Sequence, residues 1–306
     1  CSRGRGSSFF LSLYMQPIPI VYEEPHFLLV NKPAALFSQA PAGIDNLQSR
    51  LITQLKTRDQ HPGEPFVGLP HRLDRGTSGI MLIARNQRAL KRFGQQFQSR
   101  KVIKHYLAVV EGVFANVDAA SASGSHAAPA PDQLGRVDPP GEQRWEDYLR
   151  KIPGVAQAES VSADAQGAKL AVARGECLCS ASEQSLLRIQ LETGRMHQIR
   201  IQAASRGLPV VGDASYGATL PWSNDYTAST HGPIAQDTVT EDGLATDMLA
   251  ASADDQAHSH PPIALHAWSL EFRHPQTAKA MRFIAPVPNH WQQLPSELKA
   301  CISELA

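Results

Sequence analysis

The chain has 306 residues, of which 42% are hydrophobic and 19% are charged, a composition typical of a globular protein with a hydrophobic core. Its 29 Lys and Arg residues balance its 29 Asp and Glu residues, so net charge favours neither a nucleic-acid-binding protein nor an enzyme for acidic substrates. Four cysteines are too few for a disulfide scaffold, and no apolar run approaches the roughly 18 residues of a membrane span. We therefore expect a cytoplasmic protein with reduced thiols and no association with membranes.

The first third of the chain predicts short strands alternating with helices. In chain order, the expected elements are two strands joined by a turn within 18–30, a helix over 45–57, a strand over 79–84, a helix over 86–99 and a strand over 102–110. Asn86 is placed to cap the second helix, because an Asn side chain can accept a hydrogen bond from a free backbone N–H of the first turn. On the last strand, Lys104 and Tyr106 are expected to share one face.

Two segments, 116–184 and 218–262, interrupt this pattern. The first includes an Ala-, Ser- and Pro-rich run over 118–131, and the second carries seven acidic residues with no Lys or Arg. Such compositions are typical of loops and disordered chain. We interpret both segments as low-complexity insertions, the first containing strand fragments.

The rest of the chain predicts regular structure again. The expected elements are a strand over 185–192, a helix over 197–206, strands over 263–273 and 280–285, and a helix over 290–304. Because strands and helices interleave at hairpin-like spacings, we expect an α/β (α+β) fold with a mixed, mainly antiparallel sheet flanked by helices. We expect a single domain over 18–306, preceded by a poorly ordered extension over 1–17.

The charges are sorted along the chain. Residues 71–106 contain nine Lys or Arg residues and one acidic residue, Asp74. A solvated helix face usually mixes the two signs, so this segment indicates a surface that binds phosphates. The alternative is an incidentally basic surface that the acidic segment 218–262 balances.

Asp74 lies in a turn before an apolar strand. Arg72 and Arg75 flank it, and neighbouring cations favour the ionised carboxylate. Such a carboxylate can serve as a structural counter-ion for the arginines or as a covalent nucleophile. The turn alone leaves both roles open.

A second cluster of cations, Arg195, His197 and Arg200, lies at the start of a predicted helix. Backbone N–H groups at a helix N-terminus already favour anions, so added cations there indicate an anionic partner. The alternative is a surface cluster paired with Glu192 and Asp213.

Tyr106 shares its strand face with Lys104. A tyrosine on a half-buried strand most often belongs to the core. Beside a basic segment, however, its ring can also serve as a platform on which a nucleic-acid base stacks.

Six short motifs form one ordered pattern over about residues 18–288. They are Asn31-Lys32-Pro33, His71-Arg72-Leu73-Asp74 with Thr77-Ser78-Gly79, the run 104–112 (KHYLAVVEG), the run 194–200 (GRMHQIR), Val211-Gly212-Asp213 with Tyr216-Gly217, and Leu265-His266-Ala267 with Phe272 and His274-Pro275. In this order they resemble the RluA-type family of RNA pseudouridine synthases. After Pro33 the family usually has a glycine and a nearby histidine, where this chain has the run 34–39 (AALFSQ). Many relatives also carry an N-terminal S4 domain, and with about 17 residues before the first strand we expect none here.

The resemblance implies a role for each residue that matches a family motif. Asp74 corresponds to the catalytic nucleophile, and Arg200 to the arginine that pairs with it. Tyr106 corresponds to the residue that stacks on the target base and can help to remove the proton from C5. Arg72 corresponds to the arginine that enters the RNA stack when the target uridine leaves it. The other candidate substrate-binding residues are Lys104, Arg195 and His197.

The implied reaction converts uridine to pseudouridine in structured RNA, either tRNA or rRNA. It breaks the N1–C1′ bond and forms a C5–C1′ bond without redox change, so we expect no cofactor. We also expect no metal, because the histidines at 231, 258, 260 and 266 lack ligand spacing, and no obligatory protein partner. The alternatives are a catalytically silent RNA-binding protein of the same fold and a glycosidase-like hydrolase, which would need a second carboxylate as general acid.

Overall fold

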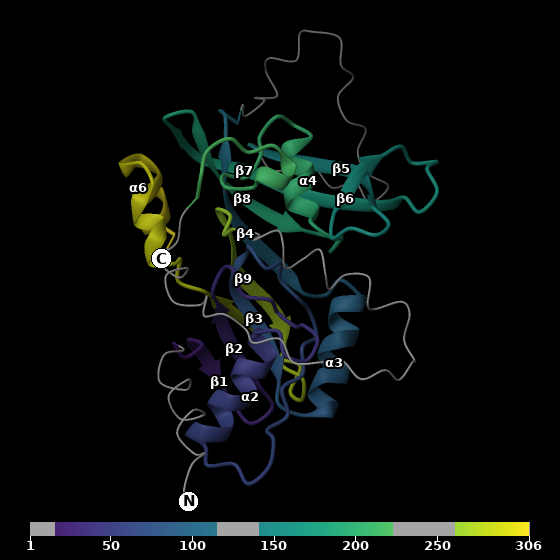
Figure 1. The fold of residues 1–306 in the computed structure, drawn as a ribbon, viewed down its shortest axis with the longest axis vertical. Coiled ribbons are helices and arrows are strands. Elements are labelled where there is room, and N and C mark those ends of the chain that lie inside the picture. Colours follow the sequence, from purple (N-terminus) through teal and green to yellow (C-terminus); the bar gives the residue numbers. More distant parts are fainter. Residues whose placement is uncertain (1–15, 115–140, 223–260, 306) are drawn as a thin grey trace, which may run out of the picture.

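The computed structural model describes residues 16–114, 141–222 and 261–305 and shows one ten-stranded sheet flanked by helices (Figure 1). The strands are β1 (Ile20–Glu23), β2 (Phe27–Lys32), β3 (Ser78–Ala84), β4 (Ile103–Glu111), β5 (Glu142–Lys151), β6 (Ala158–Val161), β7 (Lys169–Ala181), β8 (Gln184–Leu191), β9 (Leu265–Arg273) and β10 (Ala280–Ile284). Their order is β1-β2-β3-β9-β4-β8-β7-β5-β6, with β10 beside β9. Among these strands only β3 and β9 pair in parallel. The mixed, mainly antiparallel sheet is confirmed.

Helices cover both halves of the sheet. They are α2 (Leu47–Arg58), α3 (Gln87–Gln98), α4 (Gln198–Ala204) and α6 (Ser296–Ser303). Figure 1 shows α2 and α3 beside the half formed by β1, β2, β3 and β9, and α4 against the half formed by β5 to β8. As expected, Asn86 caps α3, accepting a 2.8 Å hydrogen bond from the N–H of Ala89. The elements expected over 18–110 are therefore confirmed.

The parallel contact between β3 and β9 explains one motif. Ser78 Oγ lies 2.9 Å from Nδ1 of His266, and Gly79 pairs with Ala267. Gly79 has a φ of +118°, and a Cβ added there would lie 2.3 Å from the Ala267 carbonyl oxygen. Only glycine fits so close an approach of two backbones. The Thr77-Ser78-Gly79 motif thus joins the two strands immediately after Asp74.

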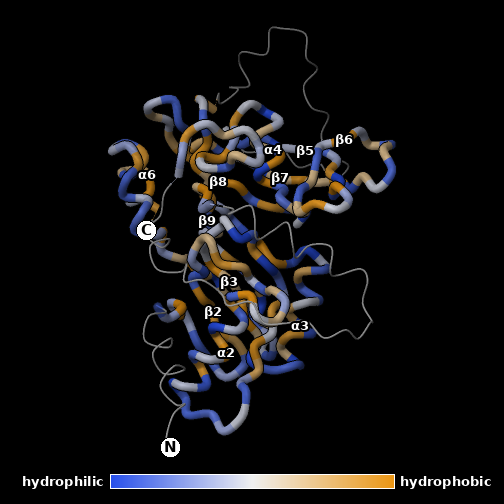
Figure 2. Tube along the Cα trace, in the orientation of Figure 1, coloured by the Kyte–Doolittle hydropathy of each residue, from blue (hydrophilic) through white to orange (hydrophobic). Residues whose placement is uncertain are grey.

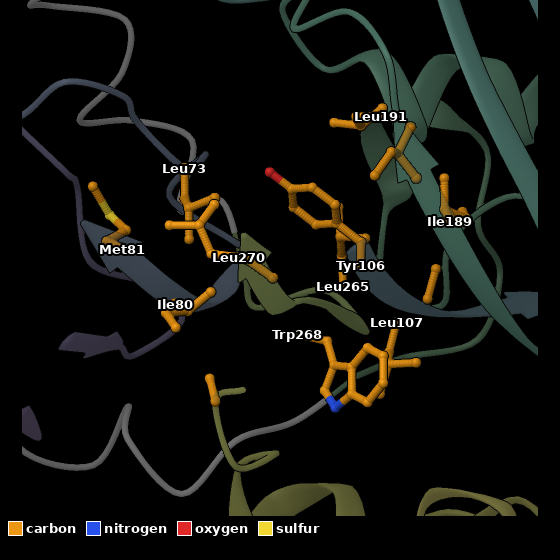
Figure 3. Packing of buried hydrophobic residues seen from close by; sticks show 14 of the residues in the cluster. Leu73, Ile80, Met81, Tyr106, Leu107, Ile189, Leu191, Leu265, Trp268 and Leu270 are labelled. Carbon is orange, nitrogen blue, oxygen red and sulfur yellow. The ribbon is translucent and has the colours of Figure 1, made fainter. Parts of the chain in front are cut away.

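One hydrophobic core runs through the sheet. Figure 2 shows hydrophobic residues along the central strands and hydrophilic residues along the outer faces of α2 and α3. Phe27, Phe93 and Phe272 meet edge to face with ring centroids 5.4–5.5 Å apart, a favoured arrangement for aromatic rings. Tyr106 lies at the margin of this core: Figure 3 shows its ring between Leu73 and Leu191, with the hydroxyl pointing away from Leu107 and Trp268.

The expectation of loops and fragments over 116–184 is wrong for 142–181. Strands β5, β6 and β7 occupy this range and extend the sheet beyond β8. The buried positions of β7 include the small residues Ala171, Val172 and Ala173. On β5, the side chain of Asp147 points inward and binds Gln202 and Arg206. A strand built in this way has a weak alternation of apolar residues. Residues 115–140, and the acidic residues of the expected insertion at 218–262, lie outside the described residues.

The C-terminal helix expected over 290–304 is divided in two. A 3-10 helix spans Asn289–Gln293, and α6 begins after Pro295. Pro295 has no backbone N–H to donate and therefore cannot continue the first helix. The remaining expected elements, over 185–192, 197–206, 263–273 and 280–285, are confirmed.

Candidate active site

A cleft of about 2200 Å³ separates the two halves of the molecule. It is lined by loops before β3 and after α3 on one side, and by β5, β7 and the start of α4 on the other. Ten Lys or Arg side chains and four acidic ones line it, the acids being Asp45, Asp74, Glu192 and Asp213. In a chain of zero net charge, this excess of cations makes the cleft suited to a polyanion.

Ser38 fixes the turn that carries Asp74 through hydrogen bonds to the backbone of Leu73. The Oγ of Ser38 accepts a 3.0 Å hydrogen bond from the N–H of Leu73 and donates a 2.7 Å bond to its carbonyl. Leu73 itself is buried in the core, and the N–H of Thr77 closes the turn on the Asp74 carbonyl at 3.1 Å. Ser38 belongs to the run 34–39, where the chain departs from the family pattern.

His71 holds the other end of the same turn. Its Nε2 accepts a 3.0 Å hydrogen bond from the N–H of Leu82, and its ring stacks on Phe97 at 4.6 Å. Burial lowers the pKa of His71 to about 3, so the ring is neutral and can accept this bond. Together, Ser38 and His71 fix the backbone on both sides of Asp74.

Replacement of Ser38 by Ala tests this anchoring. The variant leaves a buried N–H and a buried carbonyl of Leu73 without their partner, so we expect a loss of about 1–3 kcal/mol in the free energy of unfolding. We also expect a lower kcat with little change in KM, because the turn that carries Asp74 loosens. Urea unfolding and steady-state kinetics measure the two effects, with Ser99→Ala, an exposed serine at the end of α3, as control. Equal behaviour of the two variants would contradict the anchoring role.

The basic groups nearest to Asp74 come from another part of the chain. Arg200 Nη1 and His197 Nε2 lie 3.9 and 4.0 Å from its Oδ2. The alternative role of Asp74 as a structural counter-ion for Arg72 and Arg75 has no ion pair to support it among the described residues: Arg75 donates to the Ala35 carbonyl, and Arg72 is exposed at the cleft. No side-chain hydrogen bond to Asp74 forms among the described residues, and its side chain is 33% exposed.

Arg200 is held mainly by Asp213. Its Nε and Nη2 donate to the two carboxylate oxygens of Asp213 at 2.6 and 2.8 Å, and its guanidinium lies 4.8 Å from the Tyr216 ring centre. Burial alone would lower the pKa of Arg200, but the hydrogen bonds to Asp213 and the charges of Asp213 and Asp74 raise it. Both partners are buried, so the alternative of a surface cluster with Asp213 is wrong. Arg200 is a fixed cation that presents its remaining Nη1 to Asp74.

His197 connects the site to the far side of the cleft. It lies in the left-handed region with a φ of 51°, directly before α4, and its Nδ1 is 2.8 Å from the Tyr216 hydroxyl. The same hydroxyl accepts a 3.1 Å hydrogen bond from the N–H of Ala158, at the start of β6. Asp74, His197, Tyr216 and β6 therefore form one continuous chain of polar contacts.

Tyr106 projects from β4 into the cleft and is 8% exposed. Burial raises the pKa of its phenol, and the nearby charge of Asp74 raises it further because it disfavours a second anion. Tyr106 is therefore a neutral phenol at physiological pH. Its place in the cleft with Asp74 and Arg200 agrees with the expected grouping of these three residues.

The candidate substrate-binding residues also line the cleft: Arg72, Lys104, Arg195 and His197. Arg195 is anchored by a 2.9 Å hydrogen bond from its Nε to the Leu170 carbonyl on β7. Burial lowers the pKa of Lys104 to about 8, so this amine loses its charge in mildly alkaline solution.

The lowered pKa of Lys104 predicts a pH dependence of RNA binding. The cation is present below pH 8 and is lost as the pH rises through this value, so affinity for RNA should fall about three- to tenfold as one phosphate contact disappears. The Lys104→Arg variant keeps its charge and should bind RNA equally well at about pH 7 and pH 9.5. Filter binding of one RNA transcript across this range measures the difference. A parallel loss of affinity in both proteins would contradict the assignment to Lys104.

Several residues of the site could not be found by sequence reasoning. Arg150, Lys151 and Lys169 line the cleft but lie in the range expected to be an insertion. Lys32, quoted only as part of a motif, is fully buried and donates to the carbonyls of Leu36 and Pro33 at 2.7 and 3.0 Å. Four Lys or Arg residues between 150 and 174 were the one feature of the sequence that could have pointed to Arg150, Lys151 and Lys169. No feature of the sequence pointed to Ser38, which fixes the Asp74 turn.

A sheet of this topology with an acid, a tyrosine and an arginine in a basic cleft matches a known class of enzyme. A model of the family described as RNA pseudouridylate synthase matches residues 26–205, and the chain belongs to this family. The chain is 32% identical over 284 residues to the ribosomal large subunit pseudouridine synthase D of Xanthomonas campestris pv. campestris, which covers 92% of this chain and 70% of that enzyme. It is 29% identical to the enzyme of the same name from Pseudomonas aeruginosa, over 92% and 72% of the two chains.

Solved structures support the same fold. The human RNA pseudouridylate synthase domain containing 4 superposes with a TM-score of 0.58 at 19% identity, over 90% of each chain. The human RNA pseudouridylate synthase domain containing 1 gives a TM-score of 0.56 at 20% identity, over 94% of this chain and 90% of that one. The expected family, fold and activity are confirmed: the chain is an RNA pseudouridine synthase, an isomerase that converts uridine to pseudouridine.

Two further observations concern residues 16–114, 141–222 and 261–305. In these stretches no helix combines the length and apolar character that crossing a bilayer requires. The same stretches contain no group of three or more His, Cys, Asp or Glu side chains arranged to hold a metal ion.

Proposed function

We propose that this enzyme modifies uridine in ribosomal RNA of the large subunit, in the cytoplasm, with Asp74 as its nucleophile. The names of the similar enzymes support the substrate, since these are large-subunit synthases that match over nine-tenths of this chain. The basic cleft supports an RNA substrate of some size. The assignment of Asp74 depends on the contacts of the four cleft carboxylates.

Asp74 differs from the other three carboxylates of the cleft. Each of the others is bound to an arginine: Asp45 to Arg50, Glu192 to Arg174 and Asp213 to Arg200. At least one oxygen of each is thus occupied, whereas Asp74 has Nη1 of Arg200 at 3.9 Å and Nε2 of His197 at 4.0 Å and no hydrogen bond from any described residue. A carboxylate that is held near a cation but keeps its lone pairs free is suited to nucleophilic attack. The proposal that Asp74 is the nucleophile rests on this difference between Asp74 and the other three carboxylates.

The reaction can be followed through the residues of the cleft. A uridine extruded from the RNA stack lies against Tyr106, and the Asp74 carboxylate attacks the nucleoside while the N1–C1′ bond breaks. The detached uracil turns so that C5 bonds to C1′, and the bond to Asp74 breaks, which regenerates the carboxylate. The proton of C5 leaves and N1 takes up a proton, so substrate and product have the same composition. Because the pKa of Tyr106 is raised, its phenol is a poor base at neutral pH. The structure therefore favours base stacking over proton removal as the role of Tyr106.

The same contacts argue against a glycosidase-like hydrolase. Such an enzyme uses a second carboxylic acid to protonate the leaving group. Each of the three other carboxylates in the cleft is held by an arginine, so none is placed as a free acid beside Asp74. A catalytically silent RNA-binding protein would have no need for an acid with free lone pairs beside a fixed arginine.

Analysis of the product separates these possibilities. Purified enzyme is incubated with a large-subunit rRNA transcript, and the nucleosides are resolved by mass spectrometry with chemical labelling. Pseudouridine without free uracil is the expected result. Free uracil would indicate hydrolysis, and unchanged RNA would contradict catalysis on this substrate.

Two variants of Tyr106 test the stacking role. Tyr106→Phe keeps the ring and should bind RNA as tightly as the wild-type enzyme, whereas Tyr106→Ala should weaken binding by about 1–3 kcal/mol. Equilibrium binding to the same rRNA transcript measures both. Equal affinity of the two variants would contradict a stacking platform.

A further inference from the structure

The arginines of the described residues divide into two kinds. Seventeen are described, and ten of them pair with a carboxylate. Four of the other seven, Arg72, Arg75, Arg100 and Arg195, line the catalytic cleft. The remaining three lie outside it: Arg88 and Arg92 belong to α3, and Arg273 ends β9, where its backbone bonds to Gln96 of α3. Arginines without an acidic partner thus occur at the cleft and at one other place.

This second place is the outer face of α3 near its N-terminal end. Arg92 donates to the Pro275 carbonyl in the turn between β9 and β10, and Gln96 exchanges two 2.8 Å hydrogen bonds with the backbone of Arg273. Arg88 and Lys91 are exposed and lie three residues apart, so they share one face of the helix. We call Arg88, Lys91, Arg92 and Arg273 the α3 surface.

The α3 surface places like charges together without compensation. Its four cations form no ion pair among the described residues, and α3 contains no acidic residue. Arg88 also lies in the first turn of the helix, where the helix dipole favours anions over cations. Outside the cleft, every other described arginine pairs with a carboxylate, so this cluster is a local exception that an external anion would neutralise.

The direction of α3 relates this surface to the cleft. The helix ends at Gln98, and Phe97, Gln98 and Arg100 line the cleft. At a rise of 1.5 Å per residue, Arg88, Lys91 and Arg92 lie about 15, 10 and 9 Å from Gln98 along the helix. Figure 1 shows α3 running along the outside of the half formed by β1, β2, β3 and β9. Exposed Gln95 and Gln98, both hydrogen-bond donors, continue the same face toward the cleft.

We propose that the α3 surface is a second RNA contact, which binds the phosphate backbone of the substrate several nucleotides away from the target uridine. This inference rests on the proposed function, since the RNA in the cleft is the RNA that continues along α3. If the inference holds, tight binding requires an RNA long enough to reach from the cleft to the α3 surface. A short fragment around the target uridine does not reach that surface. Binding there contributes to affinity and leaves the chemistry at Asp74 unchanged.

The test compares two double variants of equal charge on two RNAs. Arg88→Gln with Lys91→Gln removes two cations of the α3 surface, and Lys56→Gln with Lys299→Gln removes two from α2 and α6. The long probe is a large-subunit rRNA transcript, and the short probe is a fragment of about 15 nucleotides around a uridine that the enzyme modifies in that transcript. Dissociation constants are measured as a function of salt, and turnover is measured on the short probe.

We expect the α3 double variant to bind the transcript at least about tenfold more weakly near 0.1 M salt, with a salt slope reduced by about 1.5. Its kcat and KM on the short fragment should equal those of the wild type, and the control variant should bind both RNAs normally. Equal transcript affinity of the two double variants would overturn the inference, and so would an equal loss on both probes. Failure of the proposed function is seen separately, as absence of pseudouridine with the wild-type enzyme. An α3 surface that serves an acidic protein would leave RNA affinity unchanged and so overturn the proposal.

Discussion

Replacement of Asp74 by Asn is expected to abolish pseudouridine formation while RNA affinity stays within a few-fold of wild type. The amide preserves the size of the side chain but cannot act as an anionic nucleophile, so the rate should fall by at least about a thousandfold. The fold should be unaffected, because the Asp74 side chain is one-third exposed and accepts no hydrogen bond from the described residues. Single-turnover assays on a modified transcript measure the loss.

A matched control distinguishes the nucleophile from a general effect of charge. Asp164→Asn makes the same chemical change at an exposed turn between β6 and β7, at a residue that does not line the cleft, and should leave turnover unchanged. Retention of even a tenth of wild-type turnover by Asp74→Asn would remove Asp74 from the nucleophile role.

The second large effect is expected at the buried pair of Arg200 and Asp213. Replacing Arg200 by Met leaves the Asp213 carboxylate buried without its two hydrogen bonds, and we expect a loss of about 3–5 kcal/mol in the free energy of unfolding. This is a large part of the roughly 5–15 kcal/mol that stabilises a typical domain. Activity should also be lost, because Arg200 is one of the two basic groups near Asp74. Urea unfolding measures the stability.

The double variant Arg200→Met with Asp213→Leu separates stability from catalysis. Removing both charges relieves the uncompensated carboxylate, so the double variant should be more stable than Arg200→Met alone, by about 1–3 kcal/mol. It should nevertheless stay inactive, since the cation beside Asp74 is still missing. If the double variant is no more stable than the single one, the pair does not stabilise the fold as described, and recovery of activity would exclude a role for Arg200 at Asp74.

Much of the fold could be predicted because the pattern of apolar residues was strong where strands are fully buried. Residues 79–84 form β3, whose residues are all buried, and Asn86 caps the next helix by a local hydrogen bond. Strands β5 and β7 escaped prediction for the opposite reason. Small residues fill the buried positions of β7, and Asp147 interrupts the alternation on β5 because it binds polar partners on α4 and just after it.

For the site, the sequence could identify the main residues, but it could not predict most of the contacts that hold them in place. That Asp74, Tyr106 and Arg200 line one cleft was foreseen, since the resemblance assigned them to one reaction. The resemblance also implied that Arg200 pairs with Asp74, and Arg200 Nη1 lies 3.9 Å from Asp74 Oδ2. The proximity of His197 to Asp74 and the contacts that fix the Asp74 turn were not foreseen, because a contact between distant segments leaves no trace in local sequence. Ser38 holds the turn from 35 residues away.

The central claim is that this cleft isomerises uridine in ribosomal RNA through Asp74. Site-resolved pseudouridine mapping of large-subunit rRNA tests it most directly, in cells that lack the gene and carry either the wild-type enzyme or Asp74→Asn. We expect that one or a few positions lose pseudouridine without the gene, regain it with the wild-type enzyme and remain uridine with the variant. An identical map in all three strains would contradict the rRNA substrate, and restoration of the lost positions by Asp74→Asn would contradict the mechanism.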